Sequence, residues 1–168
     1  TMAIDAQVMD IFLATNGVLL TEKISEFLVD NQVARLEVSL DAATPETYKK
    51  IRGKNELDKI EANLHRLIEI KKARNSQLPV IRLAFCVQEL NYQERGAFLD
   101  KWRDHVDYVD FQLMVDFGDI DKLRESGTVA GVDEMELDST HCAYPFNSLH
   151  VWADGNITPC CTFFAKSQ

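Results

Sequence analysis

Apolar positions along the first two thirds of the chain alternate between strand-like and helix-like spacing. Short apolar runs at 10–15, 35–40, 80–88 and 108–115 predict four β-strands. Between them, apolar residues three and four positions apart predict amphipathic helices. A strand followed by a helix, four times over, is typical of parallel strands joined by right-handed crossovers.

The first predicted helix spans 21–31, and its apolar face is expected to hold Leu20, Ile24, Phe27 and Leu28. The side chains on this face should therefore pack against the sheet.

Local signals mark where the later helices begin and end. Thr44 is a predicted N-cap and Pro45 a first helical residue, and Gly53 ends that helix. A longer amphipathic helix follows and ends near residue 74. Asn91 is expected to cap the helix after the third strand, because Glu94 lies at capping-box spacing from it.

The strand–helix rhythm stops after Phe117. Residues 118–139 are acidic and irregular, and from Cys142 onward the pattern becomes short β-structure. Asp154 and Gly155 predict the turn of a hairpin between 148–153 and 157–162. We therefore place a domain boundary near residue 138.

Four strand–helix units are about half of an eight-unit barrel. The predicted fold class is α/β: a partial (β/α) barrel with parallel strands over 1–138, followed by a short β-hairpin cysteine module over 139–168.

Composition narrows the function classes. Of 168 residues, 46% are hydrophobic and 27% charged, an ordinary globular balance. The formal net charge of −9 argues against nucleic acid and anionic membranes as partners. No apolar run is long enough to span a bilayer and no secretory signal is evident, so the expected location is the cytoplasm.

The cysteines point to chemistry near the end of the chain. Cys142, Cys160 and Cys161 all lie in the last 27 residues. A hairpin turn at Gly155 would bring Cys160 back toward Cys142, and paired thiolates are ligands for zinc and for iron–sulfur clusters. The alternative is three ordinary buried cysteines. Cys160 and Cys161 are adjacent in a strand and would face opposite ways, so we do not expect both to bind one metal.

The segment 141–161 resembles the opening of a SPASM domain, the auxiliary iron–sulfur module of radical S-adenosylmethionine enzymes. That opening has a cysteine, nine to fifteen residues, a glycine, four residues and a cysteine, which Cys142, Gly155 and Cys160 match.

The upstream part resembles the (β/α)6 partial barrel of the same enzymes. Thr15-Asn16-Gly17 is similar to the end of its third strand, and Ser39-Leu40-Asp41 is similar to the end of its fourth. Ile51-Arg52-Gly53 resembles the helix that follows, and the run from Val87 to Glu94 resembles the exit from the fifth strand.

The resemblance implies binding roles for five residues. It implies that Ser39 and Thr15 hydrogen-bond S-adenosylmethionine, with Asn16 nearby. The alternative for Thr15, Asn16 and Gly17 is that they form only a polar turn. Asp41 is either a ligand contact or a partner of the following helix N-terminus. Arg82 would bind the methionyl carboxylate from inside the barrel, or else lie on the solvent face of an edge strand.

Two family elements do not occur in the chain: the C-x3-C-x2-C loop and the Gly-Gly-Glu element. The later SPASM cysteines do not occur either. We therefore expect an internal fragment of a longer enzyme that cleaves S-adenosylmethionine and abstracts hydrogen from a peptide or small-molecule substrate. In that parent, Cys142 and Cys160 would ligate a [4Fe–4S] cluster.

By itself the chain is expected to be inactive and to hold neither cofactor. The alternative is a non-catalytic zinc-binding or oligomerising half-barrel module. Unpaired strand edges at 10–15 and 108–115 predict a homo-oligomer.

Overall fold

The computed structural model describes residues 2–8, 10–113, 150–151 and 155–158. The chain divides into two compact units, 1–114 and 115–168, which are described separately. The boundary expected near residue 138 lies outside the described residues and stays a prediction.

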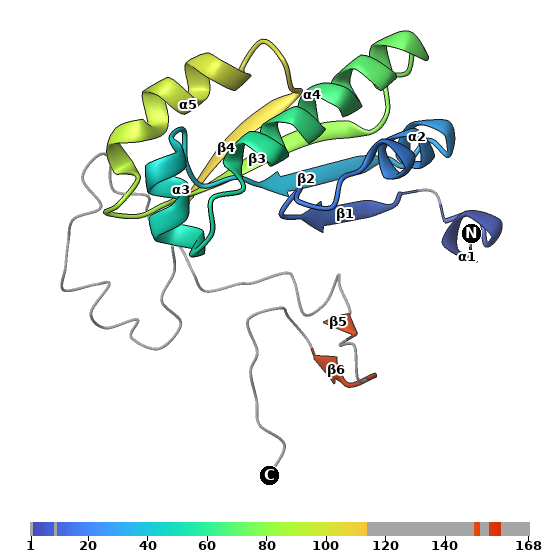
Figure 1. Ribbon diagram of the computed structural model, residues 1–168. Helices are drawn as coiled ribbons and strands as arrows, with labels where there is room; N and C mark the ends of the chain where they lie inside the picture. The colour runs from blue at the N-terminus through green and yellow to red at the C-terminus, as the bar shows by residue number, and fades with distance from the viewer. Residues whose placement is uncertain (1, 9, 114–149, 152–154, 159–168) are drawn as a thin grey trace, which may run out of the picture. The chain divides into compact units, whose positions relative to one another are not determined.

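The first unit alternates strands and helices, as the hydrophobic pattern predicts (Figure 1). Its elements in chain order are α1 (Met2–Asp5), β1 (Phe12–Thr15), α2 (Glu22–Asp30), β2 (Arg35–Ser39), α3 (Pro45–Arg52), α4 (Leu57–Ala73), β3 (Val80–Val87), the 3-10 turn η1 (Tyr92–Glu94), α5 (Arg95–Trp102) and β4 (Tyr108–Leu113). Thr44 caps α3 by accepting a hydrogen bond from the backbone N–H of Thr47 at 3.3 Å. Gly53 ends α3 with a φ of 78°.

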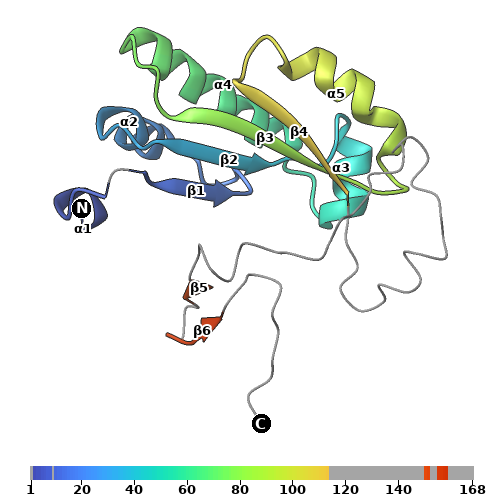
Figure 2. The same ribbon diagram turned by 180° about the vertical axis from the view of Figure 1, so that it is seen from behind.

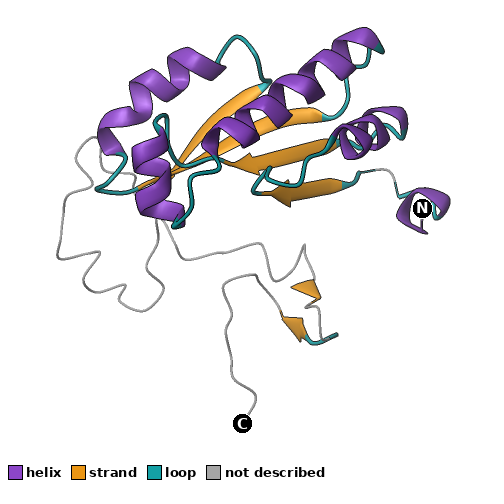
Figure 3. Ribbon diagram, viewed as in Figure 1, coloured by secondary structure: helices purple, strands orange, loops and turns teal. Residues whose placement is uncertain are grey.

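The four strands form one parallel sheet in the order β1-β2-β3-β4. Because spatial order follows chain order, every right-handed crossover puts its helix on the same face. Figures 1 and 3 show α2, α4 and α5 on that face, and Figure 2 shows the sheet from behind. This arrangement confirms the α/β prediction and is consistent with a partial (β/α) barrel.

The core lies between the helices and one face of the sheet. Strand residues alternate between the two faces, so every second side chain of β3 is buried against the helices: Ile81, Leu83, Phe85 and Val87. The other face, here called the open face, carries the polar side chains. On β2 these are Arg35, Glu37 and Ser39.

The predicted buried face of α2 is partly wrong. Leu20 and Leu28 are buried as predicted, but Ile24 and Phe27 are 42% and 39% exposed, and Ser25 and Val29 are buried in their place. The reason is that α2 packs against α4 on one side, while β1 is the last strand of the sheet on the other. No described element covers Ile24 and Phe27.

In the second unit the structure describes a two-stranded antiparallel ladder. β5 (His150–Val151) pairs with β6 (Ile157–Thr158), with His150 opposite Thr158. Gly155 has a φ of 86° in the connecting turn, as a hairpin there predicts. Across the described ranges, no helix is long and apolar enough to cross a membrane.

Gly17 is the point of closest approach between the β1–α2 turn and the core. Its φ is 75°, and a Cβ built on it would lie 2.8 Å from Cγ2 of Ile60 and 3.0 Å from Cγ1 of Val38. The side-chain amide of Asn63 on α4 donates to the Gly17 carbonyl at 3.0 Å and holds the turn against the helix.

We expect Gly17→Ala to lower the free energy of unfolding by about 2–4 kcal/mol, from left-handed strain plus overpacking. Substitutions at two other glycines separate the effect of left-handed strain from the effect of overpacking. The Cβ added by Gly53→Ala has no atom within 4 Å, so this variant should lose only the cost of left-handed strain, about 1–2 kcal/mol. Gly96→Ala, in α5 with open space around it, should be neutral or stabilising by up to about 1 kcal/mol. Urea unfolding of the three variants measures this, and equal losses at Gly17 and Gly53 would refute the close approach.

Candidate ligand-binding rim

Polar residues gather where the parallel strands end. In parallel α/β sheets the carboxyl ends of the strands meet at one edge, where ligands bind. We call residues 15–17, 39–41 and 86–88 the carboxyl rim, because they end or follow β1, β2 and β3. Four predicted site residues lie on it: Thr15, Asn16, Ser39 and Asp41.

The side chains after β1 bond within their own turn. Thr15 Oγ1 accepts from the backbone N–H of Gly17 at 3.2 Å, and Asn16 Oδ1 accepts from that of Val18 at 3.1 Å. Asn63, which sequence reasoning missed, donates to the Gly17 and Val18 carbonyls. These bonds give the turn its shape, and any ligand role of Thr15 and Asn16 stays a prediction.

Asp41 is a buried carboxylate that joins three elements. Its side chain is 5% exposed and forms an ion pair with Arg52 at the end of α3. Its other oxygen, Oδ1, accepts from the backbone N–H of Cys86 on β3 at 2.8 Å. Both carboxylate oxygens therefore have protein partners, and α3 is capped by Thr44 rather than by Asp41.

Asn91 links the same strand ends from the other side. Its fully buried side-chain amide donates to the carbonyls of Asp41 and Cys86 at 2.9 and 2.8 Å and accepts from the backbone N–H of Gln88 at 2.8 Å. Asn91 occupies the predicted N-cap position, since η1 begins at Tyr92 and leads directly into α5 at Arg95. Its side chain makes no capping hydrogen bond, however, and bonds to the strand ends instead.

Glu94 makes the contact predicted for a capping box, but to a different helix. Its carboxylate accepts from the backbone N–H groups of Ala43 and Thr44 at 2.7 and 3.2 Å and from the Thr44 hydroxyl at 2.6 Å. Burial disfavours the charged form, but the hydrogen bonds from Thr44, Thr47 and the two backbone groups outweigh it and lower the pKa of Glu94. We call Asp41, Asn91 and Glu94 the brace.

Cys86 is the one rim thiol that the structure describes. Burial, followed by the neighbouring Asp41 carboxylate, raises the pKa of its thiol, and Arg52 opposes the rise. A thiol with a raised pKa is protonated near neutral pH, and the thiolate is the form that ligates metals. Within the described ranges, no group of three or more histidine, cysteine or acidic residues could hold a metal ion. Cys142 and Cys160 lie outside those ranges.

Arg82 lies on the open face, between two acidic residues of neighbouring strands. Its guanidinium pairs with Asp110 on β4, and its Nε lies 3.4 Å from Oε2 of Glu37 on β2. Gln112 also donates to Asp110, at 2.9 Å. Burial opposes ionisation of Asp110, but the bonds from Gln112 and Arg82 together with the Arg82 charge lower its pKa. β3 is an inner strand, so Arg82 is not on an edge.

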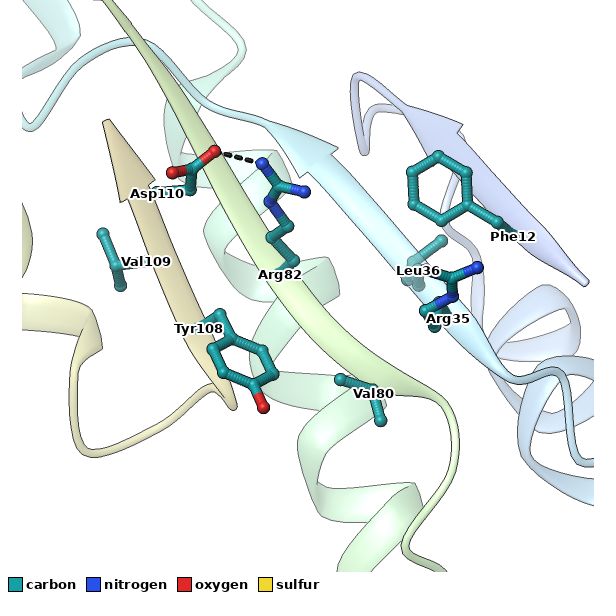
Figure 4. Close-up of a pocket in the computed structure, with 8 residues that line it drawn as sticks. All are labelled: Phe12, Arg35, Leu36, Val80, Arg82, Tyr108, Val109 and Asp110. Atoms are coloured by element: carbon teal, nitrogen blue, oxygen red, sulfur yellow. Dashed lines mark hydrogen bonds and ion pairs between the residues drawn. The ribbon is translucent and has the colours of Figure 1, made fainter. Parts of the chain in front are cut away.

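A pocket of about 360 Å³ opens below the rim, toward the amino-terminal ends of the strands (Figure 4). Figure 4 shows the Arg82–Asp110 pair across it and Arg35 beside the ring of Phe12, which the Arg35 guanidinium approaches to 5.3 Å. Its lining residues are Phe12, Arg35, Leu36, Val80, Arg82, Tyr108, Val109 and Asp110. The pocket includes Arg82 but none of the four predicted rim residues.

An open-faced sheet of parallel strands with polar carboxyl ends is the layout of a ligand-binding (β/α) barrel segment. No family model matches the chain. A probable GTP 3′,8-cyclase of Methanocaldococcus jannaschii is 33% identical over 100 residues, which is 60% of this chain and 31% of the relative.

Two further relatives carry the same description. One from Methanococcus maripaludis strain C5 is 32% identical over 99 residues, 59% of this chain and 31% of the relative. One from Methanococcus vannielii is 40% identical over 94 residues, 56% of this chain and 29% of the relative. The matched stretch thus spans about a third of these curated relatives. The chain is distantly and partially similar to GTP 3′,8-cyclase, a radical S-adenosylmethionine enzyme.

We expect Glu94→Gln to lower the free energy of unfolding by about 1–2 kcal/mol at neutral pH, because charged acceptors bond more strongly than neutral ones. The folded pKa of Glu94 is lower than that of the unfolded chain. Its stabilisation is therefore complete above the ordinary pKa of about 4.3 and is lost as the pH falls through the lowered value.

The difference between wild type and Glu94→Gln should accordingly shrink as unfolding is followed from pH 7 to pH 3. Glu89→Gln, at an exposed position five residues away, is the matched control and should leave stability unchanged. A pH-independent difference at Glu94 would contradict the assignment of a charged acceptor.

Proposed function

We propose that the chain forms part of the S-adenosylmethionine-binding barrel of a radical S-adenosylmethionine enzyme, which reductively cleaves that cofactor and abstracts hydrogen from a peptide or small-molecule substrate. The partial similarity to GTP 3′,8-cyclases carries the proposal. The parallel sheet with its polar carboxyl rim supports it independently of the identities.

Ser39 is the rim residue best suited to contact the ligand directly. It is half-buried, lies on the open face, and no hydrogen bond joins its side chain to another residue in the described part of the chain. Its register partner on β3 is the small Ala84, whose own partner on β4 is Asp110. A hydroxyl beside a small residue at a strand end leaves room for a polar ligand.

Asp41 acts in this proposal as a positioning residue. Its carboxylate is already bonded to Arg52 and to the Cys86 N–H. It therefore holds the end of β2 in register with the end of β3 and sets where Ser39 stands. Thr15 and Asn16 shape the neighbouring turn through their bonds to Gly17 and Val18.

Arg82 lies one layer below Ser39 on the open face, since side chains two apart along a strand share a face. A guanidinium has five N–H donors and can serve more than one carboxylate. We propose that the methionyl carboxylate reaches Arg82 from the rim and competes there with Asp110 and Glu37.

The described residues offer no site for an iron–sulfur cluster. We assign Cys142 and Cys160 as two ligands of one auxiliary [4Fe–4S] cluster. Its remaining ligands would come from other parts of the complete protein, and Cys161 would not be a ligand. The electron for cleavage of S-adenosylmethionine would come from a different cluster, held by the C-x3-C-x2-C motif that the resemblance implies for the complete protein.

GTP, the substrate that the relatives' names print, is the first small molecule to test. Oligopeptides are the second class, because the cysteine hairpin resembles a SPASM opening. Substrate-dependent formation of 5′-deoxyadenosine by the complete reading frame distinguishes the two classes.

In that complete protein, prepared anaerobically, we expect S-adenosylmethionine to yield 5′-deoxyadenosine under dithionite. The 168-residue chain alone should yield none, since the C-x3-C-x2-C motif does not occur in it. Ser39→Ala should raise the dissociation constant for S-adenosylmethionine about fivefold to tenfold, the equivalent of one hydrogen bond. Ser76→Ala, before the start of β3 at the opposite end, is the control, and its folding is checked by circular dichroism because the Ser76 hydroxyl bonds to Leu78 and Gln32. Product formation by the chain alone, or equal effects of the two serines, would overturn the proposal.

Iron content tests the cysteine assignment in the complete protein. After anaerobic reconstitution, Cys142→Ala and Cys160→Ala should each lower iron by up to one cluster's worth, while Cys161→Ala should leave it unchanged. Equal loss from all three variants would refute the assignment of Cys161 to the other face of the strand. Stoichiometric zinc in place of iron would favour the alternative, a structural metal-binding module.

A further inference from the structure

Asn63 is a buried polar side chain within the apolar face of α4. It shares that face with the fully buried Ile60 and Leu64 and is itself only 6% exposed. A buried amide is costly unless its donors and its acceptor find partners, whereas an apolar side chain at this position would need none. Packing of the helix alone therefore does not explain the amide.

The partners of this amide lie in the turn between β1 and α2 and on α4 itself. Asn63 Nδ2 donates to the carbonyls of Gly17 and Val18 at 3.0 and 3.3 Å. Its Oδ1 accepts from Nη1 of Arg66 at 3.0 Å. A carbonyl only accepts and a guanidinium only donates, so these partners determine which end of the amide faces the turn. Arg66 thereby holds the amide nitrogen toward the two carbonyls.

The same turn also contacts α4 one helical turn earlier. Gly17 lies so close to Ile60 of α4 and Val38 of β2 that a Cβ would be 2.8 and 3.0 Å from their side chains. Residues three apart on a helix are neighbours, so Ile60 and Asn63 contact the turn from one helix face. The contact at Ile60 limits how closely the turn approaches, and the amide holds it at that distance.

The position of the turn sets the direction of the Thr15 hydroxyl. Thr15 Oγ1 accepts from the backbone N–H of Gly17 at 3.2 Å, and Gly17 is the residue whose carbonyl Asn63 holds. A hydroxyl that accepts one hydrogen bond keeps its own proton for a different acceptor. At the carboxyl rim, Thr15 can therefore donate to an oxygen atom of a ligand.

We propose that Asn63, oriented by Arg66, is a positioning residue for S-adenosylmethionine: it holds the turn so that the Thr15 hydroxyl donates to an oxygen of this ligand. The inference rests on the proposed function, and Asn63 itself does not touch the ligand. Asn63→Asp is the sharpest variant, because it has nearly the same shape and still accepts from Arg66. Its carboxylate has no proton for the two carbonyls and repels them.

Equilibrium dialysis of S-adenosylmethionine against the complete protein, prepared anaerobically and without reductant, measures the effect. Asn63→Asp should raise the dissociation constant about fivefold to tenfold, the equivalent of one hydrogen bond. Under dithionite, the rate of 5′-deoxyadenosine formation at saturation should be unchanged per folded molecule. Ile68→Val is the control, because it trims another side chain of α4 that is 6% exposed, and it should leave the dissociation constant unchanged. A variant that is only less stable loses active molecules and keeps the dissociation constant of the rest.

Combined variants test whether Asn63 acts through Thr15. Asn63→Asp should add little to Thr15→Val, because the hydroxyl that the amide positions is already absent. Ser39→Ala removes a hydroxyl on a different strand, so its effect and that of Asn63→Asp should multiply. Arg66→Met, at a partly exposed position, removes only the bond that orients the amide. It should raise the dissociation constant by less, and it tests the inference even where Asn63→Asp does not fold, which circular dichroism checks.

The outcomes separate this inference from the proposed function. An unchanged dissociation constant in Asn63→Asp and Arg66→Met, or effects of Asn63→Asp and Thr15→Val that multiply, would overturn the positioning role while the wild-type protein still binds S-adenosylmethionine. A wild-type protein that does not bind S-adenosylmethionine would overturn the proposed function, and this inference with it.

Discussion

The burial of the Asp41 carboxylate constrains the carboxyl rim more than any other feature. A charge removed from water is costly unless its partners are well placed, so Arg52 and the Cys86 N–H must both be held where they can serve it. Meeting that requirement fixes the last turn of α3 and the ends of β2 and β3 relative to one another. Asn91 supplies the missing bonds of the same loops, because backbone groups at buried strand ends also need partners.

The brace of Asp41, Asn91 and Glu94 occupies the polar groups at the carboxyl ends of the strands, whereas the pocket lies nearer the amino-terminal ends. Most polar side chains at the strand ends are hydrogen-bonded to other parts of the protein, which leaves the half-buried Ser39 as the side chain of the rim best placed to contact a ligand. Arg82, Asp110 and Glu37 form a charged cluster on the open face, in which Asp110 lies in register with Ala84 and Arg82 lies two residues nearer the start of β3. Arg82 and Asp110 also line the pocket that holds Phe12 and Tyr108. A ligand bound beside Ser39 would therefore have the charged side chains of Arg82 and Asp110 as neighbours on the open face.

The sequence predicted the features that depend on interactions between residues close together in the chain. The four strands, the Thr44 cap and the Gly53 stop depend on residues within a few positions of one another, and the structure has them all. The sequence singled out Glu94 and Asn91 as a capping box, but the Thr44 partner of Glu94 and the Asp41 partner of Asn91 lie about fifty residues away. A capping-box spacing contains no information about such distant partners. The role of Asn63 gave no local signal, since an asparagine within an amphipathic helix ordinarily faces water.

The uncharged stretch from residue 11 to residue 21 also has a consequence for handling the protein. At neutral pH a net charge of −9 keeps molecules apart, although the exposed apolar side chains between residues 8 and 27 favour association. That repulsion vanishes toward the isoelectric point of about 4.9, whereas the apolar contact area does not change with pH. Colloidal stability is therefore poorest in mildly acidic buffer, where the exposed apolar side chains of colliding molecules meet without electrostatic repulsion.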